Sequence, residues 1–303
     1  MSKRKRGDRA SKRPVQHQQS KQHLHLLLDD WERGYSIHRL DVDAFDSDAV
    51  LSPKRVTEPP IARIESPHVR SWNFVSHGSK IFAMKPRESS PGVPAFDAHT
   101  LALTICPWPS CRADHVIPIF VSVGGKLFLF LEDRTEYLAD PTPYDSDVPW
   151  SWTAVVDAPP LPFYNAQVSC YAVHPDGRTL FVSAGGGTFS FDADRLEWTH
   201  RGDWVLPFDG QAYFDPQLEA WVGLCGDRDK AGHLCSCNVT AEFTRPPYGK
   251  LCKDKLFDKK ADLHRGAKLV YMGDSKFCLV ESMFQSTRMT TWLTGAGAGA
   301  CFA

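Results

Sequence analysis

The chain has 303 residues, of which 42% are hydrophobic and 23% charged, a composition typical of a globular protein. No apolar run reaches the ~18 residues that a membrane helix needs, and the N-terminus has no apolar signal core, so neither membrane insertion nor secretion is expected. The nine cysteines are an odd number, which favours reduced thiols in the cytosol or nucleus over a disulfide framework.

The formal net charge of −1 is unevenly distributed. Residues 1–22 contain eight lysines and arginines and one acidic residue, whereas the rest of the chain carries 27 basic and 35 acidic residues. We expect residues 1–22 to form a disordered basic tail, the one segment suited to binding nucleic acid. Its basic clusters resemble a nuclear-localisation signal, and the alternative is a tail that increases solubility and has no targeting function. The residues of this signal are Lys3, Arg4, Lys5, Arg6, Lys12 and Arg13.

From residue 24 onward the pattern changes to short strands. Residues 24–45 contain an apolar run followed by period-two alternation, which predicts half-buried strands, and residues 46–58 form a polar connection. Residues 72–84 read as a hairpin around a His-Gly-Ser turn, and the turn at 97–100 separates two further strands.

The same pattern of strand, tight turn and strand continues to residue 284, and no stretch has the periodicity of a long amphipathic helix. Several of these segments end in a tryptophan-bearing strand or in prolines. The segments are 117–133, 150–163, 171–183, 187–198, 210–225 and 266–284.

One unit recurs along the chain: an apolar strand, a glycine turn, a second apolar strand, a loop, a Phe-Asp turn and a Trp strand. Gly78, Gly125 and Gly177 each precede an Ile/Leu-Phe pair, at intervals of about 47 and 52 residues. A repeat of about 50 residues with four short strands is the period of kelch-type propeller blades. We therefore expect an all-β, kelch-like β-propeller with five visible blades, whose ring the β segment at 24–45 helps to close.

Five stretches carry a resemblance to a known family: LHLLLDDWERGYSIHRLDVDAF, YAVHPDGRTLFVS, GTFSFD…EWTHRGDWVLPF, GQAYFDPQLEAWVGL and GAKLVYMGDSKFCLVESMF. They resemble the grass-specific plant proteins grouped as domain of unknown function 1668 (DUF1668), over about residues 22–285. The resemblance implies a kelch-like propeller scaffold with no established activity and no catalytic residues to carry over. Residues 286–303 depart from the family pattern as a low-complexity end, which indicates a truncated or frame-altered C-terminus. The expected organisation is a tail at 1–22, a propeller at 23–285 and a second tail at 286–303.

Candidate metal ligands do not fit a known template. The thiol cluster has the spacing C-x9-C-x-C-x14-C, which matches no regular zinc site, and small buried side chains are the favoured reading. The histidines at 17, 23 and 25 lack an acidic or thiol partner, and the D-x-D series at 41–48 lacks the glycine and glutamate of a calcium loop. We expect no metal or other cofactor. The members of the thiol cluster and its histidine are Cys225, Cys235, Cys237, Cys252 and His233.

Nucleophile and phosphate motifs are also absent from the sequence. The triple glycine at 185–187 is followed by neither Lys-Ser/Thr nor a helix, so we expect a hairpin turn. A copper-radical oxidase would need tyrosine and histidine ligands and a cysteine that cross-links to a tyrosine. Cys170, Tyr171 and Tyr271 are of the right type, but nothing in the sequence marks them as such a site. Exposed aromatic and charged residues at 200–204 would suit partner binding, but packing of Trp204 between blades is the preferred interpretation.

The sequence therefore favours a monomeric, non-catalytic β-propeller that serves as a protein-interaction scaffold in the nucleus or cytoplasm. Two alternatives remain open. One is a propeller enzyme of oxidase or hydrolase type with a site in the central channel, and the other is a nucleic-acid binder that acts through the basic tail. No catalytic, cofactor-binding or metal-binding residue is assigned.

Overall fold

The computed structural model describes residues 23–29, 34–42, 54–55, 59–65, 73–84, 91–110, 118–140, 149–156, 160–239, 245–257, 264–285 and 288–297. Their regular structure is almost entirely strand, with two short 3-10 helices at Asn165–Gln167 (η4) and Arg228–Lys230 (η5). None of the helices in these ranges has the length and apolar character required to cross a bilayer.

The described strands form five sheets, one of which has eight strands, and we divide that one into two, so that six antiparallel blades are numbered in chain order. Blade 1 is β1 (His23–Asp29), β2 (Tyr35–Asp41) and β4 (Ala62–Ile64). Blade 2 is β5 (Asn73–His77), β6 (Lys80–Met84), β7 (Val93–Asp97) and β8 (Leu103–Cys106). Blade 3 is β9 (Ile119–Val123), β10 (Lys126–Leu131), β11 (Arg134–Leu138) and β12 (Thr153–Ala154). Blade 4 is β13 (Val168–Val173), β14 (Thr179–Ala184), β15 (Gly187–Asp192) and β16 (Glu197–Gly202). Blade 5 is β17 (Phe208–Asp215), β18 (Ala220–Cys225), β19 (His233–Asn238) and β20 (Gly249–Lys255). Blade 6 is β21 (His264–Tyr271), β22 (Lys276–Gln285), β23 (Arg288–Gly297) and the early strand β3 (Lys54–Arg55).

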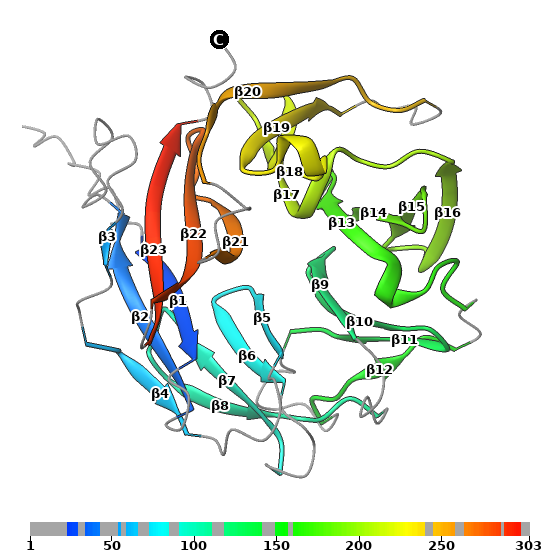
Figure 1. Ribbon diagram of the computed structural model, residues 1–303. Coiled ribbons are helices and arrows are strands. Elements are labelled where there is room, and N and C mark those ends of the chain that lie inside the picture. Colours follow the sequence, from blue (N-terminus) through cyan, green and yellow to red (C-terminus); the bar gives the residue numbers. More distant parts are fainter. Residues whose placement is uncertain are drawn as a thin grey trace, which may run out of the picture.

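The blades are arranged around a common centre, with β5, β9, β13, β17 and β21 nearest to it (Figure 1). Blades 4 and 5 are joined at this centre, because β13 and β17 pair in parallel through Cys170–Ala172 and Gly210–Ala212. The prediction of an all-β propeller of short blades is thus confirmed.

The second strand of each blade explains the continuous apolar runs in the sequence. In β10, Leu127 and Leu129 pack against blade 2, whereas Phe128 and Phe130 pack against blade 4. Successive side chains of a strand point to opposite faces, and here both faces are covered by a neighbouring blade. A strand buried on both faces loses the alternation of apolar and polar residues that marks a half-exposed strand.

A hydrophobic cluster fills each interface between adjacent blades, including the one between the last blade and the first. There Leu24 and Leu26 of β1 pack with Cys278 of β22. The same blade 6 also takes β3 as its outer strand, since Arg55 pairs with Trp292 of β23. Contacts on both sides of blade 6 therefore close the ring.

Two sequence-based boundaries differ from this arrangement. The 24–45 segment forms most of a separate first blade, and the strand that closes the ring lies in the stretch 46–58, which the sequence presents as a polar connection. Residues 288–297, assigned to a low-complexity tail, pair along β22 from Lys276 to Gln285. The boundary at residue 285 is too early, because the run RMTTWLTGAG shows neither regular alternation nor a flanking turn signal and ends in glycine and alanine.

The predicted turns occupy their expected places. Gly78, Gly125 and Gly177 have φ angles of 56°, 70° and 73° and lie between the first and second strands of blades 2, 3 and 4. The Phe-Asp turns share one chemistry, since the Asp192 carboxylate accepts the backbone N–H groups of Asp194 and Arg195, at 2.9 and 3.0 Å. Asp215 does the same for residues 217 and 218, but between the first and second strands of blade 5, so the motif marks a turn and not a fixed position in the blade.

Candidate binding face

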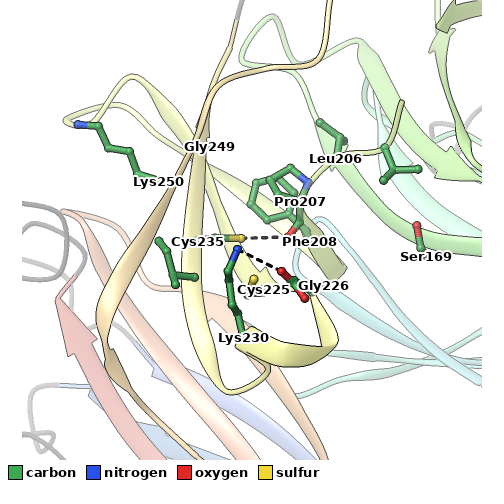
Figure 2. A pocket seen from close by; sticks show the side chains of 13 residues that line it. Ser169, Leu206, Pro207, Phe208, Cys225, Gly226, Lys230, Cys235, Gly249 and Lys250 are labelled. Carbon is green, nitrogen blue, oxygen red and sulfur yellow. Dashed lines mark hydrogen bonds and ion pairs between the residues drawn. The ribbon is translucent and has the colours of Figure 1, made fainter. Parts of the chain in front are cut away.

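A recess of about 410 Å³ opens between blades 4 and 5 (Figure 2). One wall is the connection from β16 to β17, residues 205–208, and the other is the connection from β18 to η5, residues 225–230. Its remaining lining comes from Ser169, Cys235 and the start of β20 at residues 249–251.

Hydrogen bonds fix the β16–β17 connection to both blades. On the blade 4 side, the backbone N–H of Leu206 donates to Ser183 Oγ at 2.9 Å, and that hydroxyl also contacts Thr188 Oγ1 at 2.9 Å. On the blade 5 side, the carbonyl oxygen of Pro207 accepts from the N–H of Gly226 at 2.9 Å and from Cys235 Sγ at 3.1 Å. The wall of the recess is therefore held in one place in the folded protein.

The opposite wall is stabilised by a charged turn. Asp227 caps η5 by accepting the N–H of Asp229 at 3.0 Å, and its second carboxylate oxygen lies 3.1 Å from Lys230 Nζ. The N–H of Asp229 and the ammonium of Lys230 hold the pKa of Asp227 below its ordinary value. In return, the carboxylate of Asp227 raises the pKa of Lys230. A fixed cation and a fixed anion thus stand at the rim of the recess.

Cys225 lies at the floor of the recess, at the end of β18. A hydrogen bond from Cys235 and the backbone N–H of Asp227 lower the pKa of Cys225 to about 6, against the opposing effect of burial. The same pairing and burial raise the pKa of Cys235 far above its ordinary value. Burial raises the pKa of Cys237 to about 12. Among the four cysteines of this core, Cys225 is therefore the one whose pKa is lowered.

A second recess of about 380 Å³ lies on blade 4, beside the first. It is lined by the glycine turn at 185–187, by residues 162–164 and by the pair His200–Asp203, whose Nε2 and Oδ1 atoms are 3.3 Å apart. Ala184 pairs with Gly187, and Gly185 and Gly186 have φ angles of 60° and 91°, as a two-residue hairpin turn requires. The prediction of a hairpin at the triple glycine is confirmed.

Both recesses lie on the same end of the propeller. Each includes the connection between the second and third strands of its blade, residues 185–187 in blade 4 and 225–230 in blade 5. These connections share one end because strands alternate in direction within each blade. The segment 203–205 contributes to both recesses, which makes them neighbours. We call this surface the binding face.

Large apolar side chains are exposed along the binding face. Tyr164, Val205 and Leu251 line the two recesses and are 64%, 49% and 41% exposed. Tyr248, adjacent to the lining residue Gly249, is 75% exposed. Apolar side chains grouped beside recesses are a feature of surfaces that bind other proteins.

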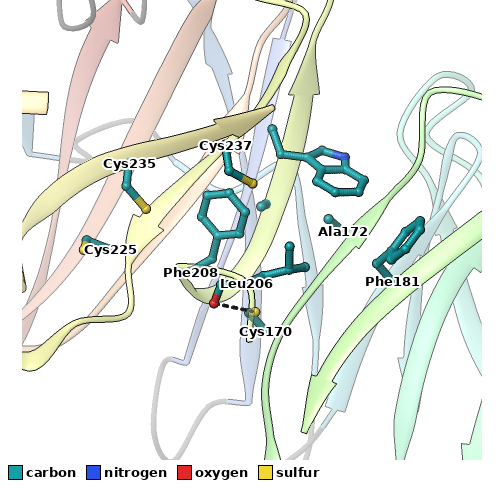
Figure 3. Close-up of a cluster of buried hydrophobic side chains, with 10 residues drawn as sticks. Cys170, Ala172, Phe181, Leu206, Phe208, Cys225, Cys235 and Cys237 are labelled. Carbon is teal, nitrogen blue, oxygen red and sulfur yellow. Dashed lines mark hydrogen bonds between the residues drawn. The ribbon is translucent and has the colours of Figure 1, made fainter. Parts of the chain in front are cut away.

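The thiol cluster singled out in the sequence divides between two sites. Cys225, Cys235 and Cys237 gather with Cys170 in the core between blades 4 and 5 (Figure 3), whereas Cys252 packs between blades 5 and 6. Within the described ranges, no group of three or more histidine, cysteine or acidic residues is arranged to hold a metal ion.

The remaining candidates are scattered or undescribed. His23 and His25 lie on β1, while His17, the acidic residues at 43–48 and the localisation residues at 3–13 fall outside the described residues. Tyr171 donates to Gln211 across blades 4 and 5 at 3.0 Å, and Cys170 points instead into the core between them. Trp204 is partly buried against that core, as the packing interpretation predicts.

The recess was not visible in the sequence because its walls come from segments up to about 80 residues apart, joined by hydrogen bonds between blades. The available signal was the pair Cys225 and Cys235, which the β18–β19 register brings to one face: Cys235 pairs with Gly223, two residues before Cys225.

The opposite end of the ring carries a different polar contact. His77 Nδ1 lies 2.8 Å from Ser122 Oγ, which links the first strands of blades 2 and 3. Burial lowers the pKa of His77, and Asp140 acts in the other direction.

Comparison with known proteins gives one family match. The chain matches the family described as "Protein of unknown function (DUF1668)" over residues 21–298. No curated protein matches it by sequence.

Three solved structures show a general likeness in shape. A nidogen/laminin complex gives a TM-score of 0.47 at 12% identity, with 90% of this chain and 98% of that chain covered. The Pan2 WD40 domain of Neurospora crassa gives 0.42 at 8% identity, with 77% and 63% covered. A mitotic checkpoint complex gives 0.42 at 10% identity, with 90% and 71% covered. No residue's role carries over at these identities.

Proposed function

Because the chain belongs to the DUF1668 family, whose function is unknown, its activity has to be inferred from its own surface, and we propose that it is a non-catalytic protein-interaction scaffold. The partner docks on the binding face, across the two recesses of blades 4 and 5. The proposal includes a kelch-like type of propeller and a monomeric scaffold in the nucleus or cytoplasm.

The observation that carries this proposal is the exposure of Tyr164, Val205 and Leu251 beside walls that are already fixed. A rigid surface loses little conformational freedom when a partner binds, so more of the contact energy appears as affinity. The hydrogen bonds of Leu206 and Pro207 provide that rigidity on the β16–β17 connection. Removal of these apolar side chains from water by the partner then contributes the favourable free energy of binding.

The charges at the rim favour a partner segment that has both apolar and acidic residues. Lys230 is paired with Asp227, while the lining residue Lys250 belongs to the exposed start of β20. An apolar segment flanked by a carboxylate would fill the first recess and face these lysines. Complementary charge of this kind selects among partners and speeds their association.

The test compares three forms of the full chain in affinity capture from cells, followed by a binding measurement with each recovered protein. The first is the wild type, and the second replaces Val205 and Leu251 with aspartate. The third is a matched control, Leu103→Asp, which changes an exposed apolar residue on β8 of blade 2. A specific partner should bind the wild type and the control equally and the binding-face variant at least tenfold more weakly. Equal binding to all three forms would refute the assignment of this face.

Localisation and nucleic-acid binding are tested by deleting residues 1–22. If the basic tail acts as a localisation signal, the deletion changes the compartment of the protein and leaves binding in vitro unchanged. If the tail binds nucleic acid, the deletion abolishes binding that falls steeply with salt.

The hydrolase alternative is favoured by the contact of His77 with Ser122. A histidine that hydrogen-bonds a serine hydroxyl is the arrangement that activates a nucleophile, and a lowered pKa keeps the imidazole in its basic form. Turnover of an activated ester such as p-nitrophenyl acetate, lost in both Ser122→Ala and His77→Gln, would support this alternative. Equal background rates for all three proteins would leave the contact as a link between blades.

A further inference from the structure

Large exposed apolar side chains are concentrated at the outer edge of blade 2. Leu101, Leu103 and Ile105 are 49%, 63% and 54% exposed, and the last two lie on β8. Figure 1 shows β8 on the outer side of β7, and among the described strands β8 pairs only with β7. None of these residues lines the two recesses of blades 4 and 5.

The register of β7 and β8 decides which backbone groups point outward. The N–H of Asp97 donates to the carbonyl oxygen of Ala102 at 2.8 Å, which makes these two residues a hydrogen-bonded pair. Hydrogen-bonded and non-hydrogen-bonded pairs alternate along an antiparallel ladder, so Thr104 bonds to β7 while Leu103 and Ile105 do not. The N–H and C=O groups of Leu103 and Ile105 therefore face away from the blade and form an open edge.

The two faces of β8 differ in their surroundings. Cys106 is buried and packs into the core between blades 2 and 3. Leu103 and Ile105 point to the opposite face, because successive side chains of a strand alternate. Pro94 of β7 lies opposite Ile105, at a non-hydrogen-bonded position where its missing N–H costs this ladder no bond. The open backbone edge and the exposed apolar side chains thus belong to the same two residues.

The other outer strands are protected against pairing with a further strand. β3, β4, β16 and β20 each carry lysine or arginine, and β12 is only two residues long. Charged side chains and short length are the usual means by which an exposed sheet edge avoids other strands. β8 has the sequence LTIC, and no charged residue occurs from Thr100 to Ser110. Among the outer strands that the structure describes, β8 alone lacks such protection.

We propose that the edge of β8 is a binding site for an extended segment of another protein, which adds to blade 2 as a fifth strand. The N–H groups of Leu103 and Ile105 donate to this segment, and their C=O groups accept from it. The segment is apolar and uncharged opposite these residues, because a charged side chain there would lose water and meet no counter-charge. This site lies outside the binding face and does not depend on it.

The size of the edge favours a flexible segment over a second copy of this chain. β8 has four residues, of which Leu103 and Ile105 present open backbone groups. A stable complex of folded proteins buries about 1,200–2,000 Å² of surface, more than two rigid propellers cover when they meet along so short an edge. A flexible segment forms the same hydrogen bonds and can also follow the neighbouring surface of blade 2.

The test uses the full chain and the peptide Ac-KTVTVTK-NH2, labelled with fluorescein on its last lysine. The control peptide Ac-KTETETK-NH2 has glutamate in place of both valines. Fluorescence anisotropy should show saturable binding of the first peptide and at least tenfold weaker binding of the control. Leu103→Pro and Ile105→Pro each remove one outward N–H and should weaken binding about fivefold. No saturable binding up to about 1 mM, or equal binding by the wild type and both variants, would overturn the proposal.

Folding of the variants is checked by urea denaturation. Leu103→Pro removes no bond to β7 and should keep a nearly wild-type midpoint, whereas Thr104→Pro removes a ladder bond and should lower the midpoint. If Leu103→Pro does not fold, Leu103→Lys keeps the backbone and gives β8 the charged edge of the other blades. Binding of the valine peptide should then fall about tenfold, and an unchanged affinity would refute the site.

Amide exchange measured by NMR distinguishes the occupants of this edge. In the free protein the N–H groups of Leu103 and Ile105 should exchange at least tenfold faster than that of Thr104, and the valine peptide should slow them. Slow exchange of all three without peptide would show that the chain itself covers the edge. A concentration-dependent dimer that Leu103→Lys dissociates would assign the edge to a second copy, and either result would overturn the proposal. The form with Val205 and Leu251 replaced by aspartate should bind the peptide like the wild type, so this test and the test of the binding face fail independently.

Discussion

The hydrogen bond of Trp221 across the interface of blades 4 and 5 can be isolated by one pair of substitutions. Trp221 is fully buried, and its Nε1 donates to the carbonyl oxygen of Val173 at 2.9 Å. Trp221→Phe keeps an aromatic ring against Phe181 but removes the donor. The matched control is Trp198→Phe, because no described residue lies within hydrogen-bond range of the buried Trp198 Nε1.

The magnitude follows from what each substitution leaves behind. The smaller ring loses packing in both variants, at a cost of about 1 kcal/mol. Only Trp221→Phe also leaves the half-buried Val173 carbonyl oxygen without its donor, at a cost of about 1–3 kcal/mol. The free energy of unfolding should therefore fall by about 2–4 kcal/mol in Trp221→Phe and by about 1 kcal/mol in Trp198→Phe.

Urea denaturation followed by tryptophan fluorescence and circular dichroism measures both values. With a slope of about 3 kcal/mol per molar urea, the midpoint should shift by about 1 M for Trp221→Phe and by about 0.3 M for Trp198→Phe. Equal shifts at unchanged slope would refute the reasoning, since they would show that the Val173 carbonyl oxygen finds another donor or that the bond adds nothing.

Two further predictions concern glycine and aspartate positions in the turns. Gly232→Ala should destabilise the fold by more than about 2 kcal/mol, because φ is +92° and a Cβ would lie 1.9 Å from the carbonyl oxygen of Phe257. The control is Gly266→Ala, where a Cβ would meet open space. This substitution should change the free energy of unfolding by less than about 0.5 kcal/mol in the same urea assay. The backbone N–H groups of Arg195 and Asp194 hold the pKa of Asp192 below its ordinary value, so the folded state binds fewer protons than the unfolded state and this stabilisation is lost as pH falls from about 5 through the lowered pKa. Asp192→Asn should therefore lower the urea midpoint at pH 7, and by progressively less as the pH falls below about 4. Asp133→Asn, whose carboxylate pairs with the exposed side chain of Arg134, should change the midpoint little at any pH.

Local chemistry made the repeat visible in the sequence. Gly78, Gly125 and Gly177 mark equivalent turns, because a tight hairpin requires positive φ angles that other residues adopt at a cost. The apolar pairs that follow them lie on second strands buried on both faces. Turn residues and doubly buried strands leave strong patterns in a sequence, and these were enough to predict a propeller.

Outer strands left weaker patterns. β20 reads GKLCKDK and buries only Cys252, so nothing in its composition separates it from a polar loop. β11 and β19 were also missed, although β11 contains the fully buried Glu136, whose carboxylate accepts the N–H of Ser110 at 2.9 Å. A buried glutamate whose partner lies 26 residues away looks like a surface residue in the sequence.

The candidate site depended on contacts that no local pattern records. Cys225 and Cys235 were noticed as potential metal ligands because cysteines were dense there. Their different roles appear only once the register of β18 and β19, the carbonyl oxygen of Pro207 and the turn at Asp227 are known. Long-range geometry therefore decides the surroundings of each thiol.

The pairing of β3 with β23 has a consequence for biosynthesis. Lys54–Arg55 leaves the ribosome about 230 residues before the strand that it has to meet, so the sixth blade cannot be completed until β23 has been translated. Until then the hydrophobic side of blade 1 that faces blade 6 has no neighbour. Emergence of β23, and not the folding of any one earlier blade, should therefore be the step at which the propeller gains most of its resistance to proteases.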